Sequence, residues 1–256
     1  MVSDTQVSRR DAMERTVIDA AGLNFKKLNE AIRACNDDNI LIKNCLGQRY
    51  IAAAGNGKNI RIEGVPGNAL GAYLDSGVIE VCGNAQEAVG DTMNGGEIII
   101  HGSCGDGAGY AMRGGRIMVR GDIGYRAGIH MKTYGARPPV LIVGGSAGSF
   151  LGEYQAGGII IVLGLGRKDG MPPIHFFCGV GMYGGRIFLR CEHMPSVLVP
   201  EINAGWAEEE DLKLIEGHVS DFCDTFGYSC EDIMSGKFVM LKPTGINPYK
   251  GLYVVN

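Results

Sequence analysis

The sequence predicts an all-β core, a parallel β-helix built as a single-stranded solenoid of 19-residue coils, with a helix flanking it at each end. Three observations predict this fold. Glycines recur at one fixed interval, a short apolar strand follows each glycine pair, and shared insertions interrupt the glycine series together. Such internal self-similarity is typical of stacked coils in which each unit contacts only its neighbours.

The recurring glycines fall into three series. Early steps within each series are 19 residues, and later steps of 24 and 27 residues indicate insertions near Thr133–Pro139 and Arg167–Ile174. We expect these glycines at the corners of the coil, where tight bends and closely stacked backbones leave no room for a side chain. The series are Gly64, Gly83, Gly102, Gly121, Gly145 and Gly164; Gly71, Gly90, Gly109, Gly128, Gly152 and Gly179; and Gly77, Gly96, Gly115, Gly158 and Gly185.

The apolar strands repeat in step with the glycines, and neighbouring residues of a strand point to opposite faces. A methionine-rich ladder, which could suggest a cofactor or metal site, is predicted to pack in the core instead: Leu74, Met93, Met112, Met131, Gln155 and Met182. Two further ladders are apolar at every coil and are predicted to face the interior: Ile60, Ile79, Ile98, Ile117, Leu141, Ile160 and Ile187; and Ile62, Val81, Ile100, Val119, Val143, Val162 and Leu189.

Three parts are predicted along the chain. Residues 1–39 form an N-terminal arm and a helix at 24–36, whose apolar residues recur at helical spacing. Residues 40–191 form the β-helix. Residues 192–256 form a helix and a strap packed on or beside it; the helix spans 208–226, opens with acidic residues and stops at Gly227. The strap spans 242–256, with Tyr249 and Tyr253 as its anchors.

Composition excludes several classes of protein. The 41 glycines show no G-X-Y period, which excludes collagen. A net charge of −4 with interspersed acids and bases argues against a nucleic-acid partner. The longest apolar run, Ile159–Leu163, is far shorter than the roughly 20 residues needed to span a bilayer, so no membrane contact is predicted. The N-terminus has no apolar signal segment, so we expect a cytoplasmic protein.

Motifs that could carry chemistry are weak. The eight cysteines include no C-x-x-C pair, which argues against zinc and iron–sulfur sites and favours reduced thiols. The glycine loops at 105–109 and 144–148 belong to the 19-residue series and lack the strand–loop–helix context of a nucleotide site. The histidines show no metal-ligand spacing, and His101 shares its coil position with Cys82 and Arg120, which suggests an ordinary outward position.

One outward-facing ladder stands out because it becomes steadily more apolar: Arg61, Glu80, Ile99, Met118, Ile142, Ile161 and Phe188. We call its five apolar members the outer stripe: Ile99, Met118, Ile142, Ile161 and Phe188. An exposed patch of this size is unusual on a monomer, so we expect something to cover it. Two alternatives are open. Either the helix at 208–226 lies on the stripe, or the stripe is an interface for another subunit or a second copy.

The full repeat unit is G-x-x-G-x-x-x-G-x-x-M-x-G-G-x-I-x-V-x-G, most complete at residues 102–121. It resembles the GXGXG domain, which closes the large (alpha) subunit of glutamate synthase and recurs in a subunit of formylmethanofuran dehydrogenase. The resemblance covers residues 40–191, and the preceding helix together with residues 47–50 is similar to stand-alone versions of the glutamate synthase domain. It implies a right-handed β-helix with a structural role, bracing amidotransferase and FMN/iron–sulfur synthase domains.

The resemblance carries over the glycine framework and no catalytic, cofactor-binding or metal-binding residue. Residue 2 is valine, not a cysteine nucleophile, and neither a cysteine cluster nor an FMN barrel is present. We therefore expect a scaffold subunit without cofactors in a split glutamate-synthase-type complex, with amidotransferase and synthase subunits as partners. Two alternatives remain. One is the equivalent subunit of a formylmethanofuran dehydrogenase or another amidotransferase-coupled oxidoreductase; the other is a homo-oligomeric β-helix with its own ligand site.

Overall fold

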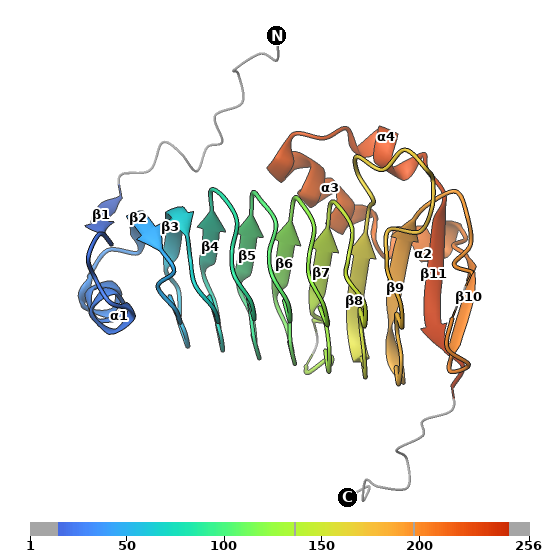
Figure 1. The fold of residues 1–256 in the computed structure, drawn as a ribbon, viewed down its shortest axis with the longest axis horizontal. Coiled ribbons are helices and arrows are strands. Elements are labelled where there is room, and N and C mark those ends of the chain that lie inside the picture. The colour runs from blue at the N-terminus through green and yellow to red at the C-terminus, as the bar shows by residue number, and fades with distance from the viewer. Residues whose placement is uncertain (1–14, 136, 197, 246–256) are drawn as a thin grey trace, which may run out of the picture.

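The computed structural model describes residues 15–135, 137–196 and 198–245, which form one large sheet with few helices (Figure 1). The sheet order is β1-β2-β3-β4-β5-β6-β7-β8-β9-β11-β10. Its strands are β1 Thr16–Asp19, β2 Asn39–Leu46, β3 Asn59–Val65, β4 Val78–Val81, β5 Glu97–Ile100, β6 Arg116–Val119, β7 Val140–Val143, β8 Ala156–Val162, β9 Gly184–Arg190, β10 Ile202–Trp206 and β11 Phe238–Pro243. The helices are α1 Phe25–Ala34, α2 Glu209–Lys213, α3 Glu216–Phe226 and α4 Cys230–Met234. No helix in the described ranges is both long and apolar enough to span a bilayer.

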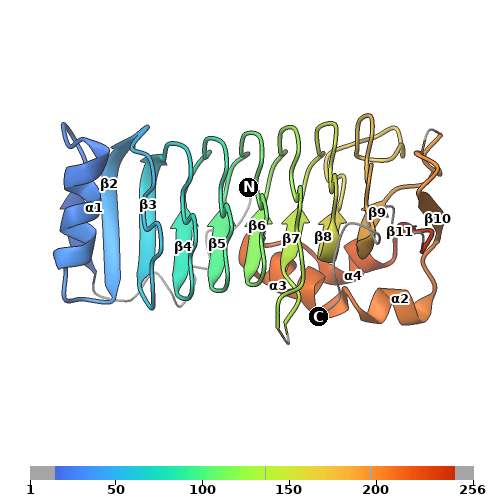
Figure 2. The same ribbon diagram turned by 90° about the horizontal axis from the view of Figure 1, so that it is seen from below.

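Strands β1–β9 pair in parallel with their neighbours in chain order, so the chain returns to the same sheet once per repeat (Figures 1 and 2). Ile98 pairs with Ile117, which pairs with Leu141 across the first insertion. Isolated parallel bridges form a second ladder through Ala85, Cys104, Ile123, Ala147 and Ile174. The predicted 19-residue register and both insertions are therefore confirmed.

The interior ladders are buried as predicted, and the methionine-rich ladder lies in the same core. Gln155 is its one polar member and is fully buried, with Nε2 donating to the carbonyls of Gly157 and Gly158. A side-chain amide can occupy this position because the neighbouring glycine corner offers acceptors.

We expect Ile117→Ala to lower the free energy of unfolding by about 2–5 kcal/mol, because the side chain is fully buried between two coils and its removal leaves a cavity. Urea unfolding followed by circular dichroism would measure the change. A loss below about 1 kcal/mol would contradict the close packing of this ladder.

A turn of unusual backbone conformation closes each coil opposite the strands. In the coil of Gly128 (φ 66°), Arg126 (φ 56°) and His130 (φ 54°) are also left-handed. The N–H of Gly128 donates back to Ala108, at 2.8 Å, while those of Arg126 and His130 donate forward to Ser149 and Glu153. The alternation connects each turn to both neighbouring coils.

Helix α1 covers the interior at the N-terminal end of the stack, and its prediction is confirmed within two residues. Asn24 caps it by accepting from the N–H of Lys27 at 3.0 Å. Leu28 and Ile32 join the interior core, so the helix closes the open end of the first coil.

The prediction of one helix over 208–226 is wrong, because the structure divides it into α2 and α3. The N–H groups of Leu214 and Ile215 bond three residues back, to Asp211 and Leu212, which tightens the last turn of α2 and ends it. The bend turns Ile215 into a buried position. The stop at Gly227 is confirmed, with a left-handed φ of 74°.

Strands β1, β10 and β11 and helix α4 were not predicted. Lys242 and Pro243, assigned to the surface strap, end strand β11, whose first four residues are buried. The rest of the strap, with Tyr249 and Tyr253, lies outside the described residues apart from Thr244 and Gly245. Beyond the predicted β-helix limit at 191, the sheet continues through β11 and β10.

Candidate interaction surface

The structure brings the five residues of the outer stripe together, and all five are buried. They form one cluster with Ile215, Val219 and Phe222, and α3 packs against β7 (Figure 2). Gly144 leaves room for this packing, because a Cβ there would lie 2.9 Å from Cζ of Phe222. The chain itself therefore covers the stripe. Ile99, Met118, Ile142, Ile161 and Phe188 do not form an open docking surface.

Polar and aromatic contacts fasten α3 at its margins. Arg116 on β6 pairs with Glu97 on β5 and with Asp221 on α3. Phe226 lies edge-on to His101, with ring centroids 5.3 Å apart, and Arg120 lies over the ring of Tyr228 at 5.9 Å. His101 thus faces outward as predicted, and Nε2 is 2.9 Å from Oε1 of Glu80.

A row of aromatic rings lies on the turns opposite the strands, with its outer members Tyr125 and Phe177 exposed and Phe150 between them half-buried. Tyr125, Phe150 and Phe177 come from successive coils; the first pair of centroids is 6.5 Å apart, and the second pair stacks at 4.9 Å. Phe176 adjoins Phe177 and is 70% exposed. Apolar rings in contact with water are unfavourable by about 25 cal/mol per Å² of apolar area, so this row favours association.

A second row runs beside the first. Tyr110 lies edge-on to His130 at 5.9 Å, and His130 stacks on Tyr154 at 5.2 Å. Both rows are carried by the left-handed turns, whose two-way hydrogen bonds hold the rings in fixed positions. We call the two rows together the aromatic face.

An ion pair lies within the aromatic face. The guanidinium of Arg126 stacks over Phe150 at 5.3 Å, and its Nε lies 3.2 Å from Oε2 of Glu153. Glu153 is only 9% exposed, and within the described part of the chain its Oε2 makes no hydrogen bond. This oxygen is itself buried and its charge is balanced by Arg126 within the chain, so the part of the ion pair that a partner could contact is the exposed guanidinium of Arg126.

Together these side chains have the composition of an interface centre, where Tyr, Phe and Arg are enriched. A few residues at such a centre contribute most of the binding free energy. Sequence reasoning missed the aromatic face because it followed the strands. The signal was available: Arg126, Phe150 and Phe177 are separated by the same steps of 24 and 27 residues that mark the two insertions in the glycine series.

The other motifs noted in the sequence have structural roles. In the loops at 105–109 and 144–148, the N–H groups of Gly109 and Gly144 donate to carbonyls of the preceding coil at 2.8 Å, which confirms that these loops belong to the repeat. Burial raises the pKa of the Cys104 and Cys178 thiols to about 12, so these side chains stay protonated. Across the described ranges, no three His, Cys, Asp or Glu side chains gather as a metal site would require.

Comparisons with known proteins agree with this architecture. A family model described as the GXGXG motif matches residues 39–244. The uncharacterized protein MJ1350 of Methanocaldococcus jannaschii is 43% identical over 254 residues, covering 94% of this chain and 97% of the relative. A chain of the formyltransferase/hydrolase complex (FhcABCD) of Methylorubrum extorquens, solved with methylofuran, shares the fold with a TM-score of 0.54 and 21% identity, covering 88% of this chain and 89% of that chain. The chain belongs to the GXGXG family.

Proposed function

We propose that this chain is a non-catalytic scaffold subunit of a split glutamate-synthase-type complex. The aromatic face carries the proposal, because stacked and partly exposed rings beside the exposed guanidinium of Arg126 suit a partner protein. The partners would be the amidotransferase and FMN/iron–sulfur synthase subunits, which the GXGXG domain braces within glutamate synthase. Membership of the GXGXG family supports this assignment.

We also propose that the stacked coils form a right-handed parallel β-helix over residues 40–191. Residues 1–39 and 192–256 then serve as its two end pieces. Burial of Leu28 and Ile32 in the interior core at one end, and pairing of β11 with β9 at the other, support this division.

A second candidate is a scaffold subunit in a complex of formyl-transfer or formylmethanofuran chemistry. The likeness to a chain of the formyltransferase/hydrolase complex favours it, because that likeness extends over most of both chains. At 21% identity this likeness concerns the fold. It therefore supports a role as a subunit of a complex and does not select the reaction of that complex.

Purification of the tagged chain from its native cell would distinguish the two candidates. Amidotransferase and FMN/iron–sulfur proteins in stoichiometric amounts would support the glutamate-synthase-type complex. Formyltransferase or hydrolase subunits would support the second candidate. Recovery of the chain alone, as a monomer or as a homo-oligomer by light scattering, would overturn the scaffold proposal.

In the same purification, we expect the double variant Phe150→Ala, Phe177→Ala to lose its partners. Removal of two stacked anchors should weaken binding by at least about 2 kcal/mol, or about 30-fold. Tyr73→Ala is the matched control, since this exposed ring also lies on a left-handed turn but in an earlier coil, outside the aromatic face. Unchanged recovery of partners by a folded double variant would show that docking occurs elsewhere.

A further inference from the structure

A cavity of about 220 Å³ lies at the N-terminal end of the stack, where α1 covers the first coils. Figures 1 and 2 show α1 at this end, beside β2. Ile32 of α1 lines one side of the cavity, and Ile60, Leu74 and Ile79 of the interior core line the other. All four side chains are buried, so the walls of the cavity are a continuation of the apolar core.

The register of the methionine-rich ladder explains why the cavity exists. Gly55 lies 19 residues before Leu74 and holds the same place in its own turn. The N–H of Gly55 donates three residues back to Ala52 at 3.0 Å, and the N–H of Leu74 donates three residues back in the same way, at 3.1 Å. Met93 fills this place one coil later, whereas Gly55 has no side chain and lines the cavity. The first coil therefore lacks the side chain that fills the later ones.

A buried asparagine fixes α1 over the cavity. Oδ1 of Asn29 accepts from the N–H of Ala52 at 3.2 Å, in the first coil. Its Nδ2 donates to the carbonyl of Phe25 at 2.8 Å and to that of Arg49 at 3.3 Å. These bonds join the helix to the coil beneath it, so the walls are in place before a ligand binds, and binding does not have to order them.

The rim of the cavity is positively charged. Arg33 and Lys58 belong to the lining, and none of the described residues that line the cavity is acidic. Nζ of Lys58 donates to the carbonyls of Cys35 and Asp37, at 2.8 and 3.0 Å, where α1 ends. Carbonyls are uncharged, so these bonds hold the ammonium group in place, keep its positive charge and leave its third N–H donor for a ligand. Arg33 is exposed, and within the described ranges neither cation forms an ion pair.

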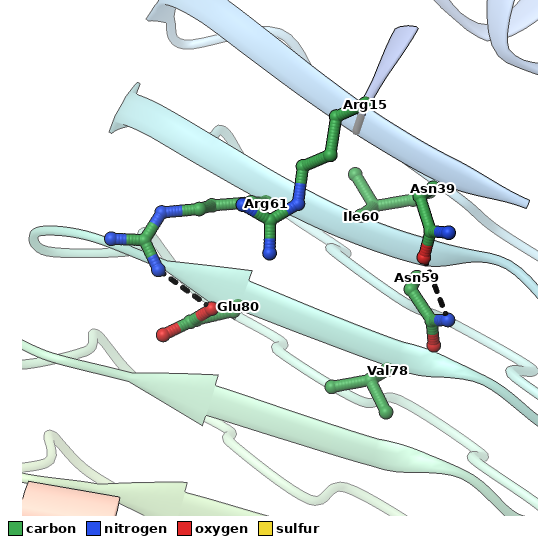
Figure 3. Close-up of a pocket in the computed structure, with 7 residues that line it drawn as sticks. All are labelled: Arg15, Asn39, Asn59, Ile60, Arg61, Val78 and Glu80. Atoms are coloured by element: carbon green, nitrogen blue, oxygen red, sulfur yellow. Dashed lines mark hydrogen bonds and ion pairs between the residues drawn. The ribbon is translucent and has the colours of Figure 1, made fainter. Parts of the chain in front are cut away.

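A second recess at the same end of the molecule lacks this property. It lies on the outward face of β2, β3 and β4, and Arg15 and Arg61 contribute to its lining. Nη1 of Arg61 lies 2.9 Å from Oε2 of Glu80 (Figure 3). Both arginines have interaction partners, so their charges are already engaged. The cavity under α1 is therefore the better candidate for a ligand site.

We propose that the cavity under α1 binds a small carboxylic acid with an unbranched alkyl chain. The chain lies against Ile32, Leu74 and Ile79, and the carboxylate lies at the rim beside Lys58 and Arg33. An apolar cavity of about 150 Å³ holds benzene, so the larger volume here suits a chain of about six carbons. The site is separate from the aromatic face and does not depend on the proposed scaffold role.

Isothermal titration of the full chain with hexanoate, butanoate and hexan-1-ol, at constant ionic strength, tests the site. Hexanoate should bind saturably and about 15-fold more tightly than butanoate, because each further buried methylene strengthens binding about fourfold. Hexan-1-ol should bind more weakly than hexanoate, because it lacks the negative charge that Lys58 and Arg33 attract.

Three variants locate the bound acid. Arg33→Gln should weaken hexanoate binding about fivefold, because it removes one cation from the rim. Lys26→Gln is the matched control, since it removes an exposed cation from the same helix outside the lining and should leave the affinity unchanged. Ala53→Leu should weaken hexanoate binding at least about tenfold, because Ala53 lines the cavity and the added carbons take the space of the alkyl chain.

Each of four results would overturn the proposal. They are no saturable binding of hexanoate, equal affinity for hexanoate and hexan-1-ol, unchanged affinity in Arg33→Gln, and unchanged affinity in a folded Ala53→Leu variant. Circular dichroism of each variant accompanies the titration, to show that it is folded. If Ala53→Leu disturbs the fold, Arg33→Gln keeps the test decisive, because Arg33 is exposed and its replacement removes no packing from the core.

Discussion

Ile142→Asp is expected to destabilise the protein by at least about 4 kcal/mol, the largest effect of any single change proposed. Ile142 is 0% exposed on β7, in the cluster that β7 forms with Val219 and Phe222 of α3. An aspartate there loses the buried apolar contacts and places a carboxylate where no partner lies, and both effects destabilise the folded state. Urea unfolding would show the loss directly.

Leu46→Asp is the control for this change, because Leu46 is 82% exposed at the end of β2. It should alter stability by no more than about 0.5 kcal/mol. The loss in Ile142→Asp should shrink as the pH falls, because burial raises the pKa of the introduced carboxyl and the neutral acid costs less to bury. A folded, stable Ile142→Asp variant at neutral pH would mean that α3 does not cover the stripe in solution.

Gly115→Ala is expected to cost at least about 2 kcal/mol more than Gly57→Ala. Both glycines have a φ of 77°, so both variants carry the same left-handed penalty of about 1–2 kcal/mol. They differ in space: a Cβ at Gly115 would lie 2.7 Å from the carbonyl oxygen of Gly96 in the preceding coil, whereas a Cβ at Gly57 meets nothing within 4 Å. The difference between the variants therefore isolates the close approach of stacked coils.

Gly217→Ala serves as the opposite control. Gly217 lies within α3 with nothing near its absent Cβ, so alanine should stabilise the helix by about 0.5–1 kcal/mol. Midpoints of urea unfolding for the three variants would rank them. Equal losses in Gly115→Ala and Gly57→Ala would mean that the corner glycines are required for their φ angles alone.

The stacked body could be predicted from the sequence because its constraints repeat. Each coil places an apolar side chain at the level of Ile98, and most coils place a glycine at the level of Gly96, so one period appears many times. Capping by Asn24 was likewise detectable, since the cap lies next to the residues it serves.

The end pieces and the aromatic face could not be predicted in the same way. Strand β11 forms because β9 offers it an edge distant in sequence, and no local pattern records that partner. Ile215, at the division between α2 and α3, is buried in the same cluster as Ile142 of β7, a neighbour distant in sequence. The ring stacking of Phe150 and Phe177 needed the turn geometry, because these residues lie between glycines and not on strands.

The two end pieces also set how long the molecule is. A parallel stack could in principle add coils indefinitely, but here the hairpin of β11 and β10 occupies the edge of β9 and α1 covers the interior at the opposite end. The number of coils between the two end pieces therefore sets the distance between the two ends of the molecule. A chain with one coil more would hold anything attached at its two ends about 4.8 Å further apart, so partner spacing could change only in whole steps of one coil.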